Sequence, residues 1–406
     1  MLGDTVREIP PSDVLFFSHD VDNSETLNGR AYGRLLDTVL ESCVERGLTV
    51  AHVSIPYSVF AEEQTYFKRY RMNRSRFVSD LARKAKLLEL TKRLSERMFR
   101  NILLRSGAKI IFSIGLPASL SIVAKALGLT TVEVLHGKGL VESDRPAIDW
   151  SNRAEEELPS AFLALDEVSY RTFVGIGFKN VRVLYASDFW LDRINNPQRG
   201  NIPSEWEAPG FLTGGRTKVV LVSLQWRYRG GTKEFEGILD NGYIPASVIK
   251  AIEKSHEDVQ WLLRLHPVLR RSNKKREAEF FLESLSQQNP NVEWQISSTV
   301  PLPSVLSIST RHVTMRSGAT VDASQMGIPT ALLCPTIAPG KSNAAVHRAL
   351  REKGLVRRFD IADDEGLLSW IRLSTGKKWL VFEEQKPISL TMVLDQIESL
   401  GCNNES

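Results

Sequence analysis

The stretch WLLRLHP, residues 261–267, combines residue types that bind anionic groups. Its apolar start predicts a short buried strand, and Arg264, His266 and Pro267 fall at the carboxyl end of that strand. Arg264 and His266 are two residues apart, so both side chains point to one face. Open α/β sheets bind ligands at this edge, where a guanidinium and an imidazole suit a phosphate. The stretch predicts an anion site; a core histidine bonded to a carbonyl is the alternative.

A second strand end of this kind lies within RHVTMRSGATVDASQMGIP, residues 311–329. A strand gives way to a helix at Ser317 and Gly318, so free N–H groups of that helix face the same edge. The hydroxyls of Ser317 and Thr320 could donate to phosphate oxygens, although serine is also a favoured N-cap. Asp322 could accept from ribose hydroxyls or only favour the helix dipole. Together with residues 261–267, this turn predicts a nucleotide site.

The first half of the chain carries its own candidate groups. A strand predicted at 130–135 ends in His136, Gly137 and Lys138, where a pyrophosphate, a carboxylate or a sugar hydroxyl could bind. A tight turn with incidental side chains explains these residues equally well. Asp20 lies in the polar loop after the first predicted strand, as a candidate base or metal ligand, and turn capping uses the same residue type.

Alternating strands and helices must position these groups. Residues 1–191 are predicted to form one Rossmann-like domain on the acceptor side. Residues 192–217 lack the periodicity of a helix or a strand and are predicted to be a linker. Residues 218–385 are predicted to form a second series of alternating strands and helices, the Rossmann-like domain that binds the nucleotide donor. Gln225 follows the first strand of that series. The last segment, 386–406, is predicted as a helix and tail that packs back on the first domain. The predicted class is α/β.

Composition is typical of a globular protein without membrane spans. The 406 residues are 42% hydrophobic and 25% charged, with a net formal charge of +4. The odd number of cysteines, three, gives neither a disulfide framework nor a CxxC metal site. The amino-terminal sequence does not have the pattern of a signal peptide, and no apolar run reaches eighteen residues. We therefore expect a cytoplasmic protein, and the mild charge gives no argument for nucleic acid.

Residues 68–105 are strongly basic. Val78, Leu81, Leu88 and Ile102 keep roughly helical spacing, which predicts a long amphipathic helix with a buried apolar stripe and a solvated basic face. The alternative is a surface for anionic lipid head groups or an anionic acceptor, which would bring the protein to the inner face of the inner membrane.

Motifs of other enzyme classes are missing, since the chain has no Walker A sequence, no GxGxxG after the first strand, no HExxH and no GxSxG. What it has is HG at 136–137, LVSLQW at 221–226, RLHP at 264–267, and SGAT followed by DASQMGIP. In this order the elements resemble the GT-B glycosyltransferases of bacterial capsule and lipopolysaccharide synthesis. RLHP and the serine turn are similar to those of transferases that use CMP-activated acidic sugars, of the Kdo and sialic acid type.

The resemblance implies two Rossmann-like domains facing across a cleft. It implies a transferase that moves an acidic sugar from a CMP donor to a glycan or lipid-linked acceptor. The CMP-sugar is the substrate, and neither a cofactor nor a metal ion is expected. It places His266, Pro267, Ser317 and Thr320 at the donor phosphate and His136 on the first-domain wall.

The resemblance leaves the catalytic carboxylate open. Related proteins carry an acid in a GYDG-like turn after the strand that ends at Gln225, where this chain has WRYRGG. The candidates are then Asp20, Glu142 and Glu234. Three alternatives keep the fold: a polyol-phosphate transferase of the CDP-glycerol type, a nonhydrolysing sugar-nucleotide epimerase, and a binding module without activity.

Overall fold

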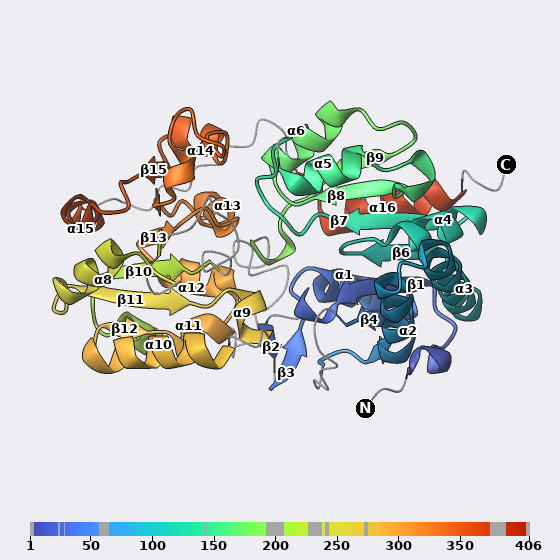
Figure 1. Ribbon diagram of the computed structural model, residues 1–406, viewed down its shortest axis with the longest axis horizontal. Coiled ribbons are helices and arrows are strands. Elements are labelled where there is room, and N and C mark those ends of the chain that lie inside the picture. The colour runs from blue at the N-terminus through green and yellow to red at the C-terminus, as the bar shows by residue number, and fades with distance from the viewer. Residues whose placement is uncertain are drawn as a thin grey trace. The chain divides into compact units, whose positions relative to one another are not determined.

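The computed structural model describes residues 4–22, 25–27, 29–56, 65–142, 144–191, 207–225, 238–239, 243–271, 275–373 and 387–402. The chain divides into two compact units (Figure 1). Unit 1 comprises Met1–Asp192 and Glu383–Ser406, and unit 2 comprises Arg193–Phe382.

Unit 1 is built on a seven-stranded parallel sheet of order β5-β4-β1-β6-β7-β8-β9. The strands are β1 (Val14–His19), β4 (Val50–Ile55), β5 (Arg69–Arg71), β6 (Ile110–Ser113), β7 (Thr130–Val134), β8 (Ala161–Ala164) and β9 (Arg182–Tyr185). Apolar runs such as VLFF in β1 are buried on both faces, as a parallel sheet covered by helices requires.

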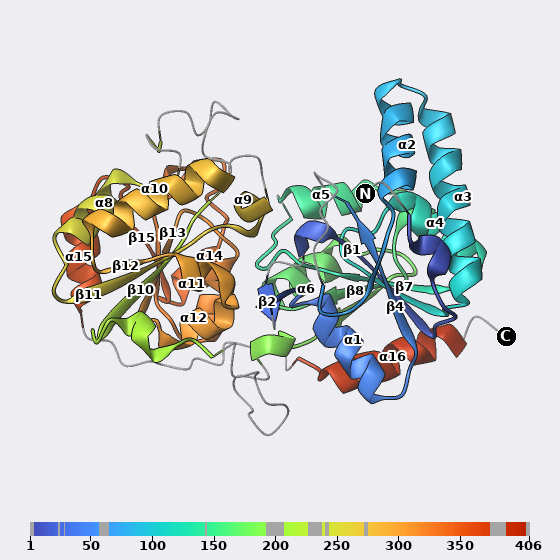
Figure 2. The ribbon, with the colours of Figure 1, turned by 90° about the horizontal axis from the view of Figure 1, so that it is seen from below.

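Helices cover both faces of this sheet (Figure 2). One face carries α3 (Leu88–Ser106), α4 (Ala118–Ala126), α5 (Arg145–Ser151) and α6 (Glu167–Ile176). The other face carries α1 (Leu36–Glu45), which packs on β1 and β4, and α16 (Leu390–Cys402), which packs on β6 and β7 and contacts α1. Val393, Leu394 and Ile397 of α16 are buried there, so the last described helix belongs to the core of unit 1.

Three local predictions in unit 1 were wrong. The sequence pattern predicts a helix from Arg30 to about Arg46, but β3 (Arg30–Tyr32) pairs antiparallel with β2 (Glu25–Leu27), because burial of the Tyr32 ring outweighs local helix propensity. Residues 140–160 are predicted as a long connector without regular structure, but they contain the helix α5. The long basic helix is two helices, α2 (Asn73–Lys84) and α3, separated by a turn at Lys86, whose φ of 58° is left-handed.

Unit 2 holds a six-stranded parallel sheet of order β12-β11-β10-β13-β14-β15. Its strands are β10 (Lys218–Ser223), β11 (Val259–Arg264), β12 (Val292–Glu293), β13 (Arg311–Thr314), β14 (Thr330–Leu332) and β15 (Val356–Arg358). Its helices are α8 (Ala246–Glu253), α9 (Pro267–Arg271), α10 (Lys275–Gln288), α11 (Gln295–Thr299), α12 (Leu302–Ile308), α13 (Ala319–Gln325), α14 (Arg348–Glu352) and α15 (Asp364–Arg372).

The register of unit 2 brings three strand ends to one level. Ser223 of β10 pairs with Arg264 of β11 on one side and with Thr314 of β13 on the other. All six residues of β11 are buried, and Val259, Trp261 and Leu263 pack in the hydrophobic core of unit 2. The segments that follow these strands therefore leave the sheet at the same edge.

Candidate functional site

The carboxyl edge of the unit 2 sheet carries the first candidate site. Gln225, His266 and Ser317 lie just beyond the ends of β10, β11 and β13, and all three are partly exposed. The Ser317 hydroxyl accepts from the N–H of Ala319 at 3.2 Å, and Gly318 is the N-cap of α13. The strand register thus brings together the ends of β10, β11 and β13, as the sequence predicted. Gln225, His266 and Ser317 form a polar rim along this edge of the sheet.

Arg264, expected at a phosphate, is instead bonded to the protein backbone. The buried guanidinium donates to the carbonyls of Ser297 and Val300, and the Ser298 hydroxyl accepts from the N–H of Leu265. These contacts fasten the end of β11 to α11. Arg264 therefore positions the segment that carries His266, and Pro267 opens α9 directly after it.

Two further predicted donor-site residues lie deeper. Thr320 has no exposed surface, and its hydroxyl has no hydrogen-bond partner among the described residues. Asp322 is 4% exposed within the first turn of α13. Their burial places them behind the rim formed by Ser317 and Gly318.

Sequence patterns missed His347, which lies beside the Ser317 turn. It has a left-handed φ of 53° and is buried, and neither ring nitrogen has a hydrogen-bond partner within the described part of the chain. Burial lowers the pKa of His347 to about 4, although the backbone of Ser317 and Arg316 opposes that shift. At neutral pH the imidazole is uncharged, so one ring nitrogen can donate a hydrogen bond and the other can accept one. The sequence around His347 predicts a helix and gives no sign that this side chain lies beside the Ser317 turn.

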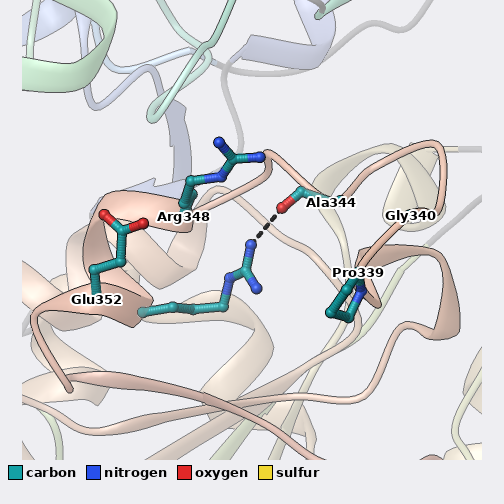
Figure 3. A pocket seen from close by; sticks show the side chains of 6 residues that line it. Pro339, Gly340, Ala344, Arg348 and Glu352 are labelled. Atoms are coloured by element: carbon teal, nitrogen blue, oxygen red, sulfur yellow. Dashed lines mark hydrogen bonds between the residues drawn. The ribbon is translucent and has the colours of Figure 1, made fainter.

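An arginine-lined hollow adjoins this histidine in the chain (Figure 3). It has a volume of about 310 Å³ and is lined by Pro339, Gly340, Ala344, Arg348, Arg351 and Glu352. Arg351 donates to the carbonyl of Ala344, and Arg348 is exposed. Burial and then repulsion from Arg348 lower the pKa of Arg351. Neighbouring like charges of this kind are relieved by a bound anion.

The carboxyl edge of the unit 1 sheet carries a pair of imidazoles. His19 ends β1, and a Cβ on Gly115, after β6, would lie 3.5 Å from the His19 ring. His136 lies beyond β7, and desolvation by its surroundings, followed by the neighbouring His19 imidazole, lowers its pKa. Glu133 holds this edge, because its carboxylate accepts from the N–H of Gly115 at 2.7 Å and of Leu116 at 2.9 Å. Burial raises the pKa of Glu133 to about 8.

Lys138 belongs to a structural ion pair. Its Nζ lies 2.7 Å from Oδ2 of the fully buried Asp188, and Arg34 lies 4.0 Å from the same oxygen. Burial disfavours the charge of Asp188, but Lys138 and Arg34 outweigh it and hold the pKa of Asp188 below its usual value. Lys138 is therefore turned to the protein interior, whereas Gly137 remains partly exposed beside His136.

Two of the three predicted catalytic carboxylates, Asp20 and Glu142, lie within the described residues. Asp20 begins the 3-10 helix Asp20–Asp22, in which Asp22 Oδ2 accepts from the N–H of His19 at 3.0 Å. That contact is the capping interaction expected of a polar turn. Glu142 is exposed, and Glu234 lies outside the described residues.

A buried group in unit 1 has the composition of a hydrolase triad without its chemistry. Ser18 Oγ lies 2.8 Å from His52 Nε2, and Asp37 is close to the other ring nitrogen. Arg69 contacts His52 Nδ1 at 2.5 Å, and since a guanidinium only donates, Nδ1 is the acceptor. Nε2–H then donates to Ser18, so the ring cannot take the serine proton. All four side chains are buried, which marks a structural network.

Comparisons with known proteins identify the fold. No family model and no curated protein matches the chain. Among solved structures, UDP-GlcNAc 2-epimerase from Methanocaldococcus jannaschii in complex with UDP-GlcNAc and UDP matches with a TM-score of 0.59 at 14% identity, over 95% of this chain and 99% of that chain. The enzyme from Neisseria meningitidis bound to UDP-GlcNAc gives 0.51 at 12% identity, over 96% and 93%. CalG4, the calicheamicin glycosyltransferase, gives 0.50 at 14%, over 96% and 98%.

The chain has the GT-B fold. The predicted α/β class with two Rossmann-like units is thereby confirmed. Similarity at 12 to 14% identity establishes architecture alone. The similar structures are epimerases that act on UDP-GlcNAc and a glycosyltransferase. UDP is the nucleotide named for the epimerases, so they lend no specific support to a CMP-linked acidic sugar.

Two negative observations concern the described residues only. None of their helices combines the length and apolar character needed to cross a bilayer. They also contain no group of three or more histidine, cysteine, aspartate or glutamate side chains arranged to hold a metal ion.

Proposed function

We propose that this protein is an enzyme acting on a UDP-linked sugar, as a nonhydrolysing sugar-nucleotide epimerase. The observation that carries this proposal is the convergence of three parallel strand ends in unit 2, with Gln225, His266 and Ser317 at the rim. Such edges are where doubly wound sheets bind nucleotides. The similarity to epimerases crystallised with UDP and UDP-GlcNAc favours this reaction over transfer.

The diphosphate would be bound by neutral donors and by arginines. The Ser317 hydroxyl and the His266 imidazole can each donate to a phosphate oxygen, and hydrogen bonds to a charged acceptor are strong. Arg348 and Arg351 supply positive charge on the segment that also carries His347. Charge on the departing nucleotide would be stabilised by these preorganised groups.

Inversion at a carbon bearing hydrogen requires a group that removes a proton and a group that returns one to the opposite face. His19 and His136 of unit 1 have suitable chemistry, because a histidine is poised between donor and acceptor near neutral pH. The lowered pKa of His136 favours the uncharged ring, which is the form that can accept a proton. We propose His19 and His136 as further candidates for proton transfer, besides the predicted carboxylates Asp20, Glu142 and Glu234.

A second candidate function is glycosyl transfer from a CMP-activated acidic sugar to a glycan or lipid-linked acceptor. The observation that favours it is the pairing of Arg348 and Arg351 in one hollow, which suits the carboxylate of such a sugar. In both candidate reactions the donor is the substrate, and we propose that neither a cofactor nor a metal ion takes part.

The two reactions differ in what they do without an acceptor. Incubation with UDP-GlcNAc in D2O should give an epimer that carries deuterium at the inverted carbon, detected by proton NMR. Ser317→Ala should slow this exchange at subsaturating substrate, whereas Ser369→Ala on the exposed face of α15 should not. If no deuterium is incorporated with UDP sugars and the protein transfers or hydrolyses CMP-Kdo, the protein is a transferase and not an epimerase. Failure of UDP, CDP and CMP to bind would reject the nucleotide site itself.

A further inference from the structure

The helices α2 and α3 form a hairpin that projects from unit 1 (Figure 2). They pack along each other, with the Ser79 and Ser95 hydroxyls 3.2 Å apart. Phe99 and Ile102 anchor the second half of α3 in the core of unit 1. The turn between the helices therefore lies at the far end of the hairpin from that core.

The hairpin exposes apolar side chains towards its turn, and three of them, Val78, Leu81 and Leu88, were wrongly predicted to lie in a buried stripe. Their exposed fractions run from 46% to 69%. We call this set the apolar tip: Phe77, Val78, Leu81, Leu87, Leu88 and Leu90. Single exposed apolar residues are ordinary, but six within fourteen positions of one hairpin form a patch that marks an interaction surface.

The same hairpin concentrates positive charge. Residues 73–106 contain ten lysines and arginines and three acidic residues, whereas the whole chain has a net charge of only +4. The rest of the chain is therefore net negative. Lys84, Lys86, Lys92 and Arg93 are exposed next to the apolar tip.

A lipid bilayer fits the combination of exposed apolar side chains and positive charge better than a protein partner does. The cores of protein interfaces are depleted in lysine, yet here Lys84 and Lys86 lie in the sequence between Leu81 and Leu88. In a membrane interface, apolar side chains enter the acyl boundary, and lysine and arginine stems lie along it with their charges among the phosphates. Neither α2 nor α3 can span a bilayer, so the contact is interfacial.

We propose that the apolar tip inserts into the head-group region of an anionic bilayer, with the basic residues of α3 against the lipid phosphates. This membrane contact does not depend on which sugar nucleotide the protein uses. It would hold the enzyme at a lipid surface through unit 1 alone.

Vesicle sedimentation with the full chain tests this proposal. Binding should be strong to phosphatidylglycerol-containing vesicles, weak to pure phosphatidylcholine, and reduced by salt. Leu81→Ser with Leu88→Ser should lower the partition coefficient on the order of tenfold or more, since two apolar side chains no longer enter the bilayer. Phe280→Ser, which removes a 76% exposed ring from unit 2, is the matched control and should leave it unchanged.

Two further measurements separate the possible occupants of the apolar tip. Leu88→Trp should show a blue-shifted emission on addition of anionic vesicles and no shift without them. Lys92→Glu with Arg93→Glu should weaken binding to anionic vesicles as strongly as the leucine changes do. The proposal is overturned if the leucine variants bind like the parent, or if the parent is a dimer without lipid that these variants dissociate, since a second copy would then cover the apolar tip.

Discussion

Substitution of Asp37 by asparagine tests the buried network that holds the end of β1. The Asp37 carboxylate accepts from Arg69 at 2.5 and 2.7 Å and from the N–H of Gly33 at 2.8 Å, and all these groups are out of contact with water. The asparagine amide keeps the shape of the carboxylate but loses its charge, which leaves the Arg69 guanidinium buried without its counter-ion. Because Arg69 also fixes the His52 tautomer, the contact from His52 to Ser18 weakens with it.

The expected cost is about 3–5 kcal/mol, the range measured when one partner of a buried pair is removed. An exposed pair in the same unit supplies the control. Arg46 and Asp395 are 3.0 Å apart, and the Asp395 side chain is 62% exposed, so Asp395→Asn should cost less than about 1 kcal/mol. The contrast between the two variants follows from burial, since both remove one carboxylate charge from an arginine.

Native-state hydrogen exchange read on the peptide that covers β1 is the assay. A loss of about 3–5 kcal/mol corresponds to amide protection lowered by roughly two to three and a half orders of magnitude, if these amides exchange through opening of unit 1. The double variant Asp37→Asn with Arg69→Met should recover part of that loss, because no charge is left unpaired. If Asp37→Asn changes protection no more than Asp395→Asn does, the network is not stabilising and the reasoning from burial fails.

The remaining predictions concern pH, the nucleotide site and a second ion pair. Burial and Arg69 lower the pKa of His52 from 6.5 to about 4, so on acidification the unfolded state binds a proton before the folded state does. The free energy of unfolding should therefore fall as the pH drops from 6.5 towards 4, by about 2 kcal/mol between pH 7 and 5. Thermal unfolding at several pH values measures this, and His52→Gln should flatten the dependence on pH. Ser317→Ala should weaken UDP binding about tenfold or more in calorimetry, as loss of a hydrogen bond to a charged group does, and an unchanged affinity would remove Ser317 from the site. Lys138→Met should destabilise unit 1 by about 3–5 kcal/mol, and Lys138→Met with Asp188→Leu should recover much of that, whereas a role in ligand binding would leave stability intact. Turnover should be the same with and without chelator, and its loss would show that a metal ion takes part.

Local sequence carried most of the architecture. Apolar runs that end in polar turns predicted the parallel strands of both units, because strands buried on both faces need continuous apolar sequence. The same logic predicted the strand ends at His266 and Ser317, since the carboxyl ends of parallel strands share one edge. These predictions failed where tertiary packing overrode local preference. At β3 the Tyr32 ring is buried, and its residues pair with β2 instead of forming the start of a helix.

What each polar side chain does was decided by the tertiary structure. Arg264 looked like a phosphate ligand, yet its partners are carbonyls 33 and 36 residues further along the chain, and no local pattern could place them there. His347, at the N-cap of α14, lies beside the backbone of Arg316 and Ser317 although these residues are far from it in the sequence. Spacing along the chain fixes which face of an element a residue occupies, whereas its partners depend on which elements meet. The sequence by itself thus determined the fold and the edge of the sheet that can bind a nucleotide, and folding determined which charges are left to bind it.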